Sequence, residues 1–401
     1  MKKILIIGAG AYQVPAIQKV REMGFEAYCV DYKEGALGYE FANGYKVIDV
    51  KDKNGCLAYA RELNVDGVLT WGATLTLPTV SYICEQMGLP CMPMATSEIS
   101  TSKYLIRQRL IECGLNSAGD CFEVYSKDEA KTMGLKAPFV IKPSDGSGSK
   151  GVRIVLDDAD INESIEYAFE GARDNHVYIE PYIPGEEYSA EVYANNGEVY
   201  VNTIVKTQFE WQGVKPVYKQ TTYLGITPEL EVIISDEVIK AVKALGINWG
   251  PCNFDIIVSS ADGKPYIIDV GIRNGQNLIA SHIVPYSRGI DELECSILNC
   301  IGEPVNAEPA QKNIISSRLL IYNPGLIEEI KPMEELIGKN GIVDIIIRKR
   351  VGEILPKYQT KSDICGWVLC MAGTAEEASK LADAAWEKLK NYIIIKENSY
   401  V

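Results

Sequence analysis

Histidine is nearly absent from this chain, which has 401 residues and only two imidazoles, at His176 and His282. A metal centre of three histidines is therefore impossible, and acid–base catalysis by histidine is disfavoured. The eleven cysteines include no pair in the C-x-x-C spacing, and their odd number does not fit a fully paired disulfide framework. Reduced thiols are the simplest explanation, so we expect a cytoplasmic protein.

Long apolar runs and long basic runs are also missing. The first apolar run, residues 4–7, ends at Gly8, and no later run approaches the roughly 20 residues that a membrane span needs. The sequence therefore predicts neither a membrane segment nor a signal peptide. There are 40 basic and 54 acidic residues, with no basic block, so we do not expect nucleic acid as a partner.

The first part of the chain has the pattern of a parallel α/β layer. Strand and helix patterns alternate in five segments, residues 3–7, 14–23, 26–31, 67–70 and 79–87. A β-strand, a helix and a second strand in this order are typical of a parallel sheet covered by helices. We therefore expect a Rossmann-like domain over residues 1–95.

Beyond residue 95 the pattern changes from α/β to α+β. A helix over 100–113 precedes short predicted strands over residues 139–142, 152–155, 177–180, 189–194 and 198–205. These strands predict a small lobe at about residues 117–193, inside a second domain over 96–305. The remainder, 306–401, has three predicted strands, over residues 317–322, 341–348 and 367–372, and ends in a helix. Thr374 and Glu377 form a capping box at its start.

A glycine turn follows the first strand. Gly8 and Gly10, with the acidic Asp31 further on, make half of a dinucleotide-binding fingerprint. The third glycine of that fingerprint is replaced by Gln13. We interpret the turn as Rossmann-like but without a bound dinucleotide. An NAD-dependent dehydrogenase remains the alternative that this turn supports.

A second glycine-rich segment has the stronger phosphate-binding pattern. Lys142 ends a predicted strand, and the loop after it contains Ser147, Gly148 and Ser149. Small residues allow backbone N–H groups to point at anionic oxygens. A Walker A motif is excluded because the lysine precedes the loop. The alternative is a solvated loop with an incidental lysine, and Lys103, in the first turn of its helix, is likewise either a phosphate contact or a plain surface lysine.

Residues 252–271 form a predicted β-hairpin whose register can be derived. A three-residue turn with Gly263 in the left-handed conformation gives an uninterrupted apolar face. The pairs on that face are Phe254–Val270, Ile256–Ile268 and Val258–Tyr266. The opposite face then sets Asp255 directly against Asp269.

Two opposed carboxylates in a hairpin need a positive partner, because like charges directly across a ladder are destabilising. Carboxylate oxygens beside substrate phosphates are what Mg²⁺ prefers, so Asp255 and Asp269 are predicted magnesium ligands. Arg273 follows on the same face and can hold a phosphoryl or carboxylate group in its planar fork. The alternative is a pair of exposed aspartates that binds no metal.

The order of these parts resembles the ATP-grasp superfamily, closest to the group of biotin carboxylase, the carbamoyl-phosphate synthase large chain and the L-amino acid ligases. The resemblance covers nearly the whole chain. It implies an ATP-grasp fold: an N-terminal Rossmann-like domain, a small lobe that closes over ATP, a central antiparallel sheet and a C-terminal closing lobe.

The resemblance also implies roles for individual residues. Lys103 and Lys142 would contact the ATP phosphates, with Lys142 and Arg273 acting in catalysis. The family's adenine-binding hinge matches Glu180, Tyr182 and Ile183. Its ribose-binding carboxylate matches Glu187.

The family's hairpin usually ends as Glu-x-Asn-x-Arg, whereas this chain has Asp269, Gly271 and Arg273 at those positions. The derived register sets Asn253 opposite Gly271. We therefore hypothesise that the Asn253 amide replaces the missing metal ligand; the alternative is that it bonds only to neighbouring backbone.

The resemblance implies a ligase that uses ATP and Mg²⁺. Family members phosphorylate a carboxylate, and an amine then attacks the acyl phosphate, which releases ADP and phosphate. We expect small-molecule carboxylate and amine substrates, with an amino acid first among them. A homodimer is compatible with the sequence, which does not define the oligomeric state. Besides the dehydrogenase, a nucleotide-binding scaffold with weak catalysis is the second alternative.

Overall fold

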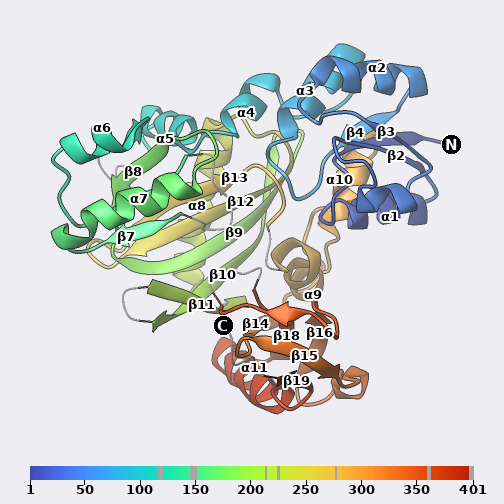
Figure 1. Cartoon of the computed structure of the whole chain (residues 1–401). Helices are drawn as coiled ribbons and strands as arrows, with labels where there is room; N and C mark the ends of the chain where they lie inside the picture. The colour runs from blue at the N-terminus through green and yellow to red at the C-terminus, as the bar shows by residue number, and fades with distance from the viewer. Residues whose placement is uncertain are drawn as a thin grey trace.

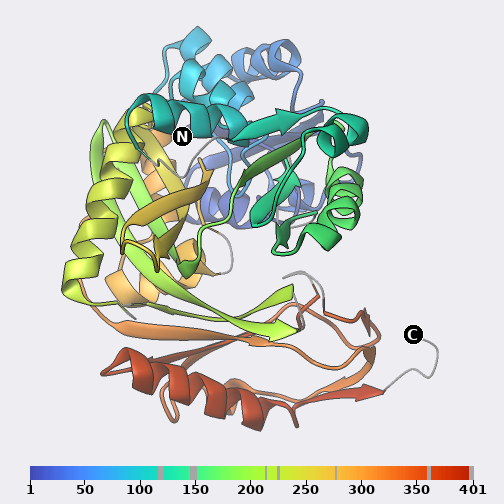
Figure 2. The ribbon, with the colours of Figure 1, turned by 90° about the vertical axis from the view of Figure 1, so that its left-hand side faces the viewer.

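The computed structural model describes residues 1–115, 121–144, 151–212, 215–223, 226–275, 278–358 and 363–396, without the side chains of 209–225. These residues form sheets of four, eight, three and four strands. None of the helices in these ranges is long and apolar enough to cross a membrane. The eleven cysteines are all free. The N-terminal layer and the C-terminal helix lie at opposite ends of the molecule (Figures 1 and 2).

The N-terminal layer is a four-stranded parallel sheet in the order β3-β2-β1-β4. Its strands are β1 (Lys3–Ile7), β2 (Glu26–Asp31), β3 (Gly44–Val47) and β4 (Gly67–Leu69). Its helices are α1 (Val14–Glu22), η1 (Leu37–Phe41), α2 (Lys53–Leu63), α3 (Leu77–Met87) and α4 (Met94–Ile99). Residues 4–7 of β1 are fully buried because helices cover both faces. The predicted parallel α/β layer is confirmed.

One later helix also belongs to this layer. Ile297 and Cys300 of α10 (Glu292–Cys300) share a buried cluster with Ile4 and Ile6 of β1. The segment before α10 contains η3 (Ile279–Ile283) and α9 (Val284–Arg288). A helix about 290 residues after the first strand thus packs against the N-terminal sheet.

The small lobe is a four-stranded sheet with two helices. Its strands, in sheet order, are β5 (Phe122–Val124), β8 (Val177–Pro181), β6 (Phe139–Pro143) and β7 (Arg153–Val155). The helical segments are α6 (Lys127–Thr132), η2 (Asp158–Asp160) and α7 (Ile161–Gly171). The predicted strands over 139–142, 152–155 and 177–180 are confirmed. The strand expected over 189–194 is present, but it pairs in the large sheet instead of the lobe.

The large sheet has eight strands in the order β13-β12-β9-β10-β11-β14-β18-β16. Its first five strands are β13 (Pro265–Gly271), β12 (Trp249–Ser259), β9 (Gly185–Asn195), β10 (Glu198–Gln212) and β11 (Lys215–Tyr223). Two helices, α5 (Lys103–Glu112) and α8 (Pro228–Ala244), share its main apolar cluster, in which Phe254 is fully buried. Figure 2 shows α8 lying along the sheet.

The C-terminal part extends the same sheet. Its strands there are β14 (Ile314–Leu320), β18 (Gly366–Ala372) and β16 (Ile342–Ile347). The remaining elements are β15 (Gly325–Ile330), η4 (Glu334–Leu336), β17 (Ile354–Leu355), α11 (Ala375–Leu389) and β19 (Ile393–Lys396). The three predicted strands are confirmed. The helix cap is also confirmed, since Thr374 Oγ1 accepts a hydrogen bond from the Glu377 N–H at 3.2 Å.

The hairpin of β12 and β13 has the predicted register only at its open end. Asp255 lies opposite Asp269, but Ile256 lies opposite Ile267, because a bulge shifts the ladder by one residue. The predicted pairs Ile256–Ile268 and Val258–Tyr266 are therefore wrong. Ile267 enters the core, whereas Ile268 is the extra residue of the bulge.

Candidate active site

Polar side chains form two rows across strands β9, β12 and β13. The first row is Ser189, Asp255 and Asp269, and the second is Glu191 and Asn253, with Gly271 completing it on β13. They alternate with buried apolar residues such as Ala190 and Phe254, so all six lie on one face of the sheet. The strand pattern thus produces a polar surface on one face of these three strands.

Lys103 supplies a positive partner for one of the two aspartates, Asp269. Helix α5 begins at Lys103 because the Ser102 side chain caps it, accepting from the Leu105 N–H. Lys103 Nζ lies 2.6 Å from Asp269 Oδ1. Burial alone would raise the pKa of Asp269, but the charges of Lys103, Lys142 and Arg273 outweigh it and hold that pKa below its usual value. The carboxylate is therefore ionised at neutral pH.

The other aspartate is held by a hydroxyl group. Ser189 Oγ donates to Asp255 Oδ1 at 2.8 Å. Asn253 Nδ2 donates to Ser189 Oγ at 3.1 Å and to Glu191 Oε2 at 3.0 Å. The amide of Asn253 is thus bonded toward β9, and its known contacts include neither aspartate.

The space above Gly271 is filled by an arginine. A Cβ atom on Gly271 would lie 3.0 Å from Arg273 Cζ, and Arg273 Nη1 donates to the Asn274 carbonyl at 2.8 Å. The Arg273 guanidinium therefore lies where a longer side chain at position 271 would be. This placement argues against an Asn253 amide that reaches over Gly271 toward a metal.

Lys142 lies in a buried ion-pair cluster. On β6 it points away from the lobe core formed by Phe139 and Ile141, and its Nζ is 2.6 Å from Glu180 Oε1. Arg107 Nη2 donates to the other oxygen, Glu180 Oε2, also at 2.6 Å. The side chains of Lys142, Glu180 and Arg107 are 9%, 8% and 6% exposed, respectively.

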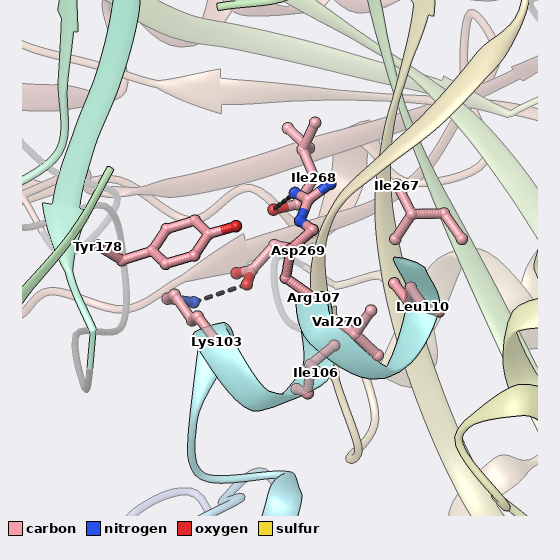
Figure 3. A pocket seen from close by; sticks show the side chains of 9 residues that line it. All are labelled: Lys103, Ile106, Arg107, Leu110, Tyr178, Ile267, Ile268, Asp269 and Val270. Atoms are coloured by element: carbon pink, nitrogen blue, oxygen red, sulfur yellow. Dashed lines mark hydrogen bonds and ion pairs between the residues drawn. The ribbon is translucent and has the colours of Figure 1, made fainter. Parts of the chain in front are cut away.

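The Ile268 carbonyl joins this cluster to the hairpin. It accepts from Lys142 Nζ at 3.0 Å and from Arg107 Nη2 at 3.5 Å. Figure 3 shows Arg107, Ile268, Lys103 and Asp269 together, with the Tyr178 ring beside them. The bulge therefore turns a backbone acceptor toward two cations.

The other predicted nucleotide contacts are placed as follows. Ser147, Gly148 and Ser149 lie outside the described residues. Tyr182 and Ile183 are half-buried in the connection between β8 and β9, and Glu187 is on β9 opposite Ile257. Glu187 shares its face of the strand with Ser189.

In the N-terminal glycine turn, backbone N–H groups already donate to side chains of the protein. The Ala9 N–H donates to Asp31 Oδ2 at 2.8 Å, and the Gly10 N–H donates to Gln13 Oε1 at 3.1 Å. Gln13 Nε2 in turn donates to the Trp71 carbonyl at 2.6 Å. A dinucleotide phosphate would need these N–H groups, so the turn is closed to it.

The sequence analysis missed Arg107, Glu191 and Glu292. Arg107 lies four residues after Lys103, on the same face of a helix, which could have indicated a shared site. Glu191 and Glu292 are both fully buried. Burial raises the pKa of Glu191 to about 7 and that of Glu292 well above its usual value. The sequence contains no pattern that joins these two positions.

Comparison with known proteins identifies the class. Residues 101–275 match the ATP-grasp domain, and residues 318–393 match the L-amino acid ligase C-terminal domain 2. The chain thus contains an ATP-grasp domain, as its sequence predicts. The L-amino acid ligase of Bacillus licheniformis has the same fold, with a TM-score of 0.79 and 23% identity over 99% of each chain.

Two further proteins show how widely this fold is used. The chain is 24% identical to the formate-dependent phosphoribosylglycinamide formyltransferase of Methanococcus vannielii, over 98% of this chain and 97% of the relative. An N5-carboxyaminoimidazole ribonucleotide synthetase, solved as an ADP complex, is 16% identical with a TM-score of 0.74, over 98% of this chain and 97% of that one.

Proposed function

We propose that this protein is an ATP-dependent carboxylate–amine ligase that acts through an acyl phosphate and releases ADP and phosphate. The observation that carries the proposal is the convergence of Lys103, Lys142 and Arg273 with the Asp255–Asp269 pair. These residues come from α5, β6 and the hairpin, and they lie where the small lobe faces the large sheet. Phosphoryl transfer needs this kind of charge neutralisation and positioning.

The chemistry has two steps. An oxygen of the acid attacks the γ-phosphorus of ATP, and ADP leaves. The amine nitrogen then attacks the acyl carbon, phosphate leaves and the nitrogen loses a proton. Lys103 and Lys142 would neutralise phosphate oxygens, and Arg273 would hold the carboxylate or phosphoryl group. No serine or cysteine nucleophile is required.

The two aspartates fit magnesium. Mg²⁺ is usually held by one or two carboxylates together with substrate phosphates, and it would stabilise the charge that develops on those phosphates. The described residues contain no group of three or more histidine, cysteine, aspartate or glutamate side chains placed to hold a metal. The phosphate oxygens of the nucleotide would therefore complete the coordination of a Mg²⁺ ion held by Asp255 and Asp269.

The remaining nucleotide contacts follow the family resemblance. Ser147, Gly148 and Ser149 would contact the phosphates through their backbone. The backbone of the segment from Glu180 to Ile183 would contact the adenine, and the Glu187 side chain the ribose. The likeness to an L-amino acid ligase over the full chain supports an amino acid as the acid substrate.

A phosphate-release screen tests the proposal. Pairs of acids and amines, amino acids first, are incubated with ATP and Mg²⁺, and both phosphate and the nucleotide product are measured. We expect ADP and phosphate for at least one pair. Formation of AMP and pyrophosphate would contradict it.

One observation favours a second candidate, a nucleotide-binding scaffold with weak catalysis. The Arg273 guanidinium lies over Gly271, where the family carries a metal-binding asparagine. ATP binding without ADP formation across the whole screen would support this candidate.

A further inference from the structure

The buried cluster of Arg107, Lys142 and Glu180 contains two cations and one carboxylate. Each carboxylate oxygen of Glu180 has its own cation at 2.6 Å, Arg107 on Oε2 and Lys142 on Oε1. All three side chains are more than nine-tenths buried. The cluster therefore carries one positive charge more than it balances, in a region of low dielectric.

Lys142 is held in this cluster by three groups. Besides Glu180, it donates to the Ile268 carbonyl at 3.0 Å and lies 5.3 Å from the centre of the Tyr178 ring. Lysine has three N–H donors, and two of them are directed at Glu180 and the Ile268 carbonyl, so a phosphate competes with these two acceptors for Lys142. If Lys142 left Glu180 without any other partner, an unpaired buried charge would remain, which is strongly unfavourable.

Arg107 removes that obstacle. It lies on α5, four residues after Lys103, and it contacts the oxygen of Glu180 that Lys142 does not use. Its guanidinium carries a permanent charge. Glu180 thus keeps a cation when Lys142 moves to a phosphate.

We infer that Arg107 is a positioning residue that competes with Lys142 for Glu180 and so makes Lys142 available to the ATP phosphates. The inference rests on the proposed function, because it assumes that Lys142 contacts ATP. Without Arg107, Glu180 would depend on Lys142 alone and hold it more firmly. ATP binding would then be weaker although no atom that touches the nucleotide had changed.

A double-mutant cycle tests the inference. The dissociation constant of the β,γ-imido analogue of ATP, with Mg²⁺, is measured by calorimetry for the parent, Arg107→Gln, Glu180→Gln and the double variant. We expect Arg107→Gln to weaken binding about 10- to 100-fold, the range for a lost hydrogen bond to a charged group. In the Glu180→Gln background the same change should cost less than about threefold, because no carboxylate remains to hold Lys142.

Two more variants separate positioning from a structural effect. Arg107→Lys keeps a positive charge beside Glu180, and a lysine can replace most of the ion pair through a single contact. Its dissociation constant for the analogue should therefore be within about threefold of the parent value. Arg109→Gln removes an arginine that is 52% exposed on the same helix and should bind like the parent. Thermal unfolding of each variant checks that it is folded.

The outcomes are distinct. Equal binding by the parent and Arg107→Gln would overturn the inference alone. If Arg107→Gln weakened binding of the analogue equally in the parent and in the Glu180→Gln variant, the inference would also be overturned, because a structural role predicts that result. Failure of the parent itself to bind the analogue would overturn the proposed function and this inference together.

Discussion

Two regions of the molecule look similar in sequence and differ in what their polar groups are doing. Both the glycine turn near Gly8 and the segment at Lys142 end a strand and combine glycine with a charged residue. In the glycine turn, Asp31 and Gln13 already bind the backbone donors. In the region of Lys142, the lysine side chains are paired with carboxylates instead. Lys103 Nζ lies 2.6 Å from Asp269, and Lys142 Nζ lies 2.6 Å from Glu180.

The difference teaches how to judge a phosphate-binding pattern. A backbone N–H that is bonded to a buried side chain loses that bond if a phosphate displaces it, and nothing replaces the side chain's partner. A lysine or arginine in an ion pair can exchange one anion for another. Availability of the donors, more than the presence of glycine, therefore distinguishes the two regions.

The largest effect is expected from Lys142→Ala. Removal of a charge that stabilises transferring phosphates should lower ATP turnover at least about 100-fold. The fold should remain, because Glu180 keeps Arg107 as its partner. Steady-state ADP formation measures the loss. Lys136→Ala, which removes a lysine that is 81% exposed on the same lobe, is the matched control, and parent-like turnover in Lys142→Ala would place the phosphate site elsewhere.

Asp269→Asn and Asp31→Asn compare the two regions directly. Asp269→Asn should raise the Mg²⁺ concentration for half-maximal activity at least about tenfold, since a charged ligand becomes neutral. Asp31→Asn should leave that value unchanged but lower the free energy of unfolding by about 1–3 kcal/mol, because one backbone donor then faces an amide N–H₂. A reversed result, with magnesium dependence altered only by Asp31→Asn, would refute the assignment of the two regions.

Asn253→Ala is expected to have a smaller effect on the metal. The Asn253 amide donates to Glu191 and Ser189, so its loss should reduce stability and leave the Mg²⁺ requirement within about twofold, given that magnesium needs few protein ligands. Activity measured over a magnesium titration checks this. A large rise in the requirement, reversed by adding Gly271→Asn, would instead restore the hypothesis of a compensating ligand.

Glu292→Gln should change only the pH dependence of stability. Folded Glu292 keeps its proton because burial raises its pKa well above the ordinary 4.5. The unfolded chain releases that proton above about pH 4.5, so the parent loses stability as the pH rises, by at most about 1.4 kcal/mol per pH unit.

Glutamine keeps the acceptor for Asn202, which donates to Glu292 Oε1 at 2.6 Å, and offers an N–H in place of the acid proton. The variant should therefore match the parent near pH 4.5 and become more stable than it as the pH rises above that value. Thermal unfolding at several pH values measures the difference. Parallel curves would show that Glu292 is not protonated in the folded state.

Much of the fold was predictable because the periodicity of apolar residues is set by burial. The parallel layer, the lobe strands and the C-terminal strands all follow from such runs. The hairpin shows the limit. Ile267 and Ile268 are both apolar, so alternation could not reveal which one enters the core and which forms the bulge.

The charged site was predictable in part. Lys103, Lys142, Asp255, Asp269 and Arg273 were named from local patterns, and the structure brings them together. The Arg107–Glu180 pair was missed because it joins residues 73 apart through the docking of α5 against the lobe. Only the tertiary arrangement determines such a contact.

The proposed reaction makes an acyl phosphate at the site of Lys142 and the aspartate pair. Trapping with hydroxylamine, in the presence of ATP, Mg²⁺ and the acid found in the screen, tests it most directly. We expect a hydroxamate formed in amounts equal to ADP, and no hydroxamate from Lys142→Ala. Hydroxamate that appears with AMP and pyrophosphate, or ADP that appears without hydroxamate, would contradict it.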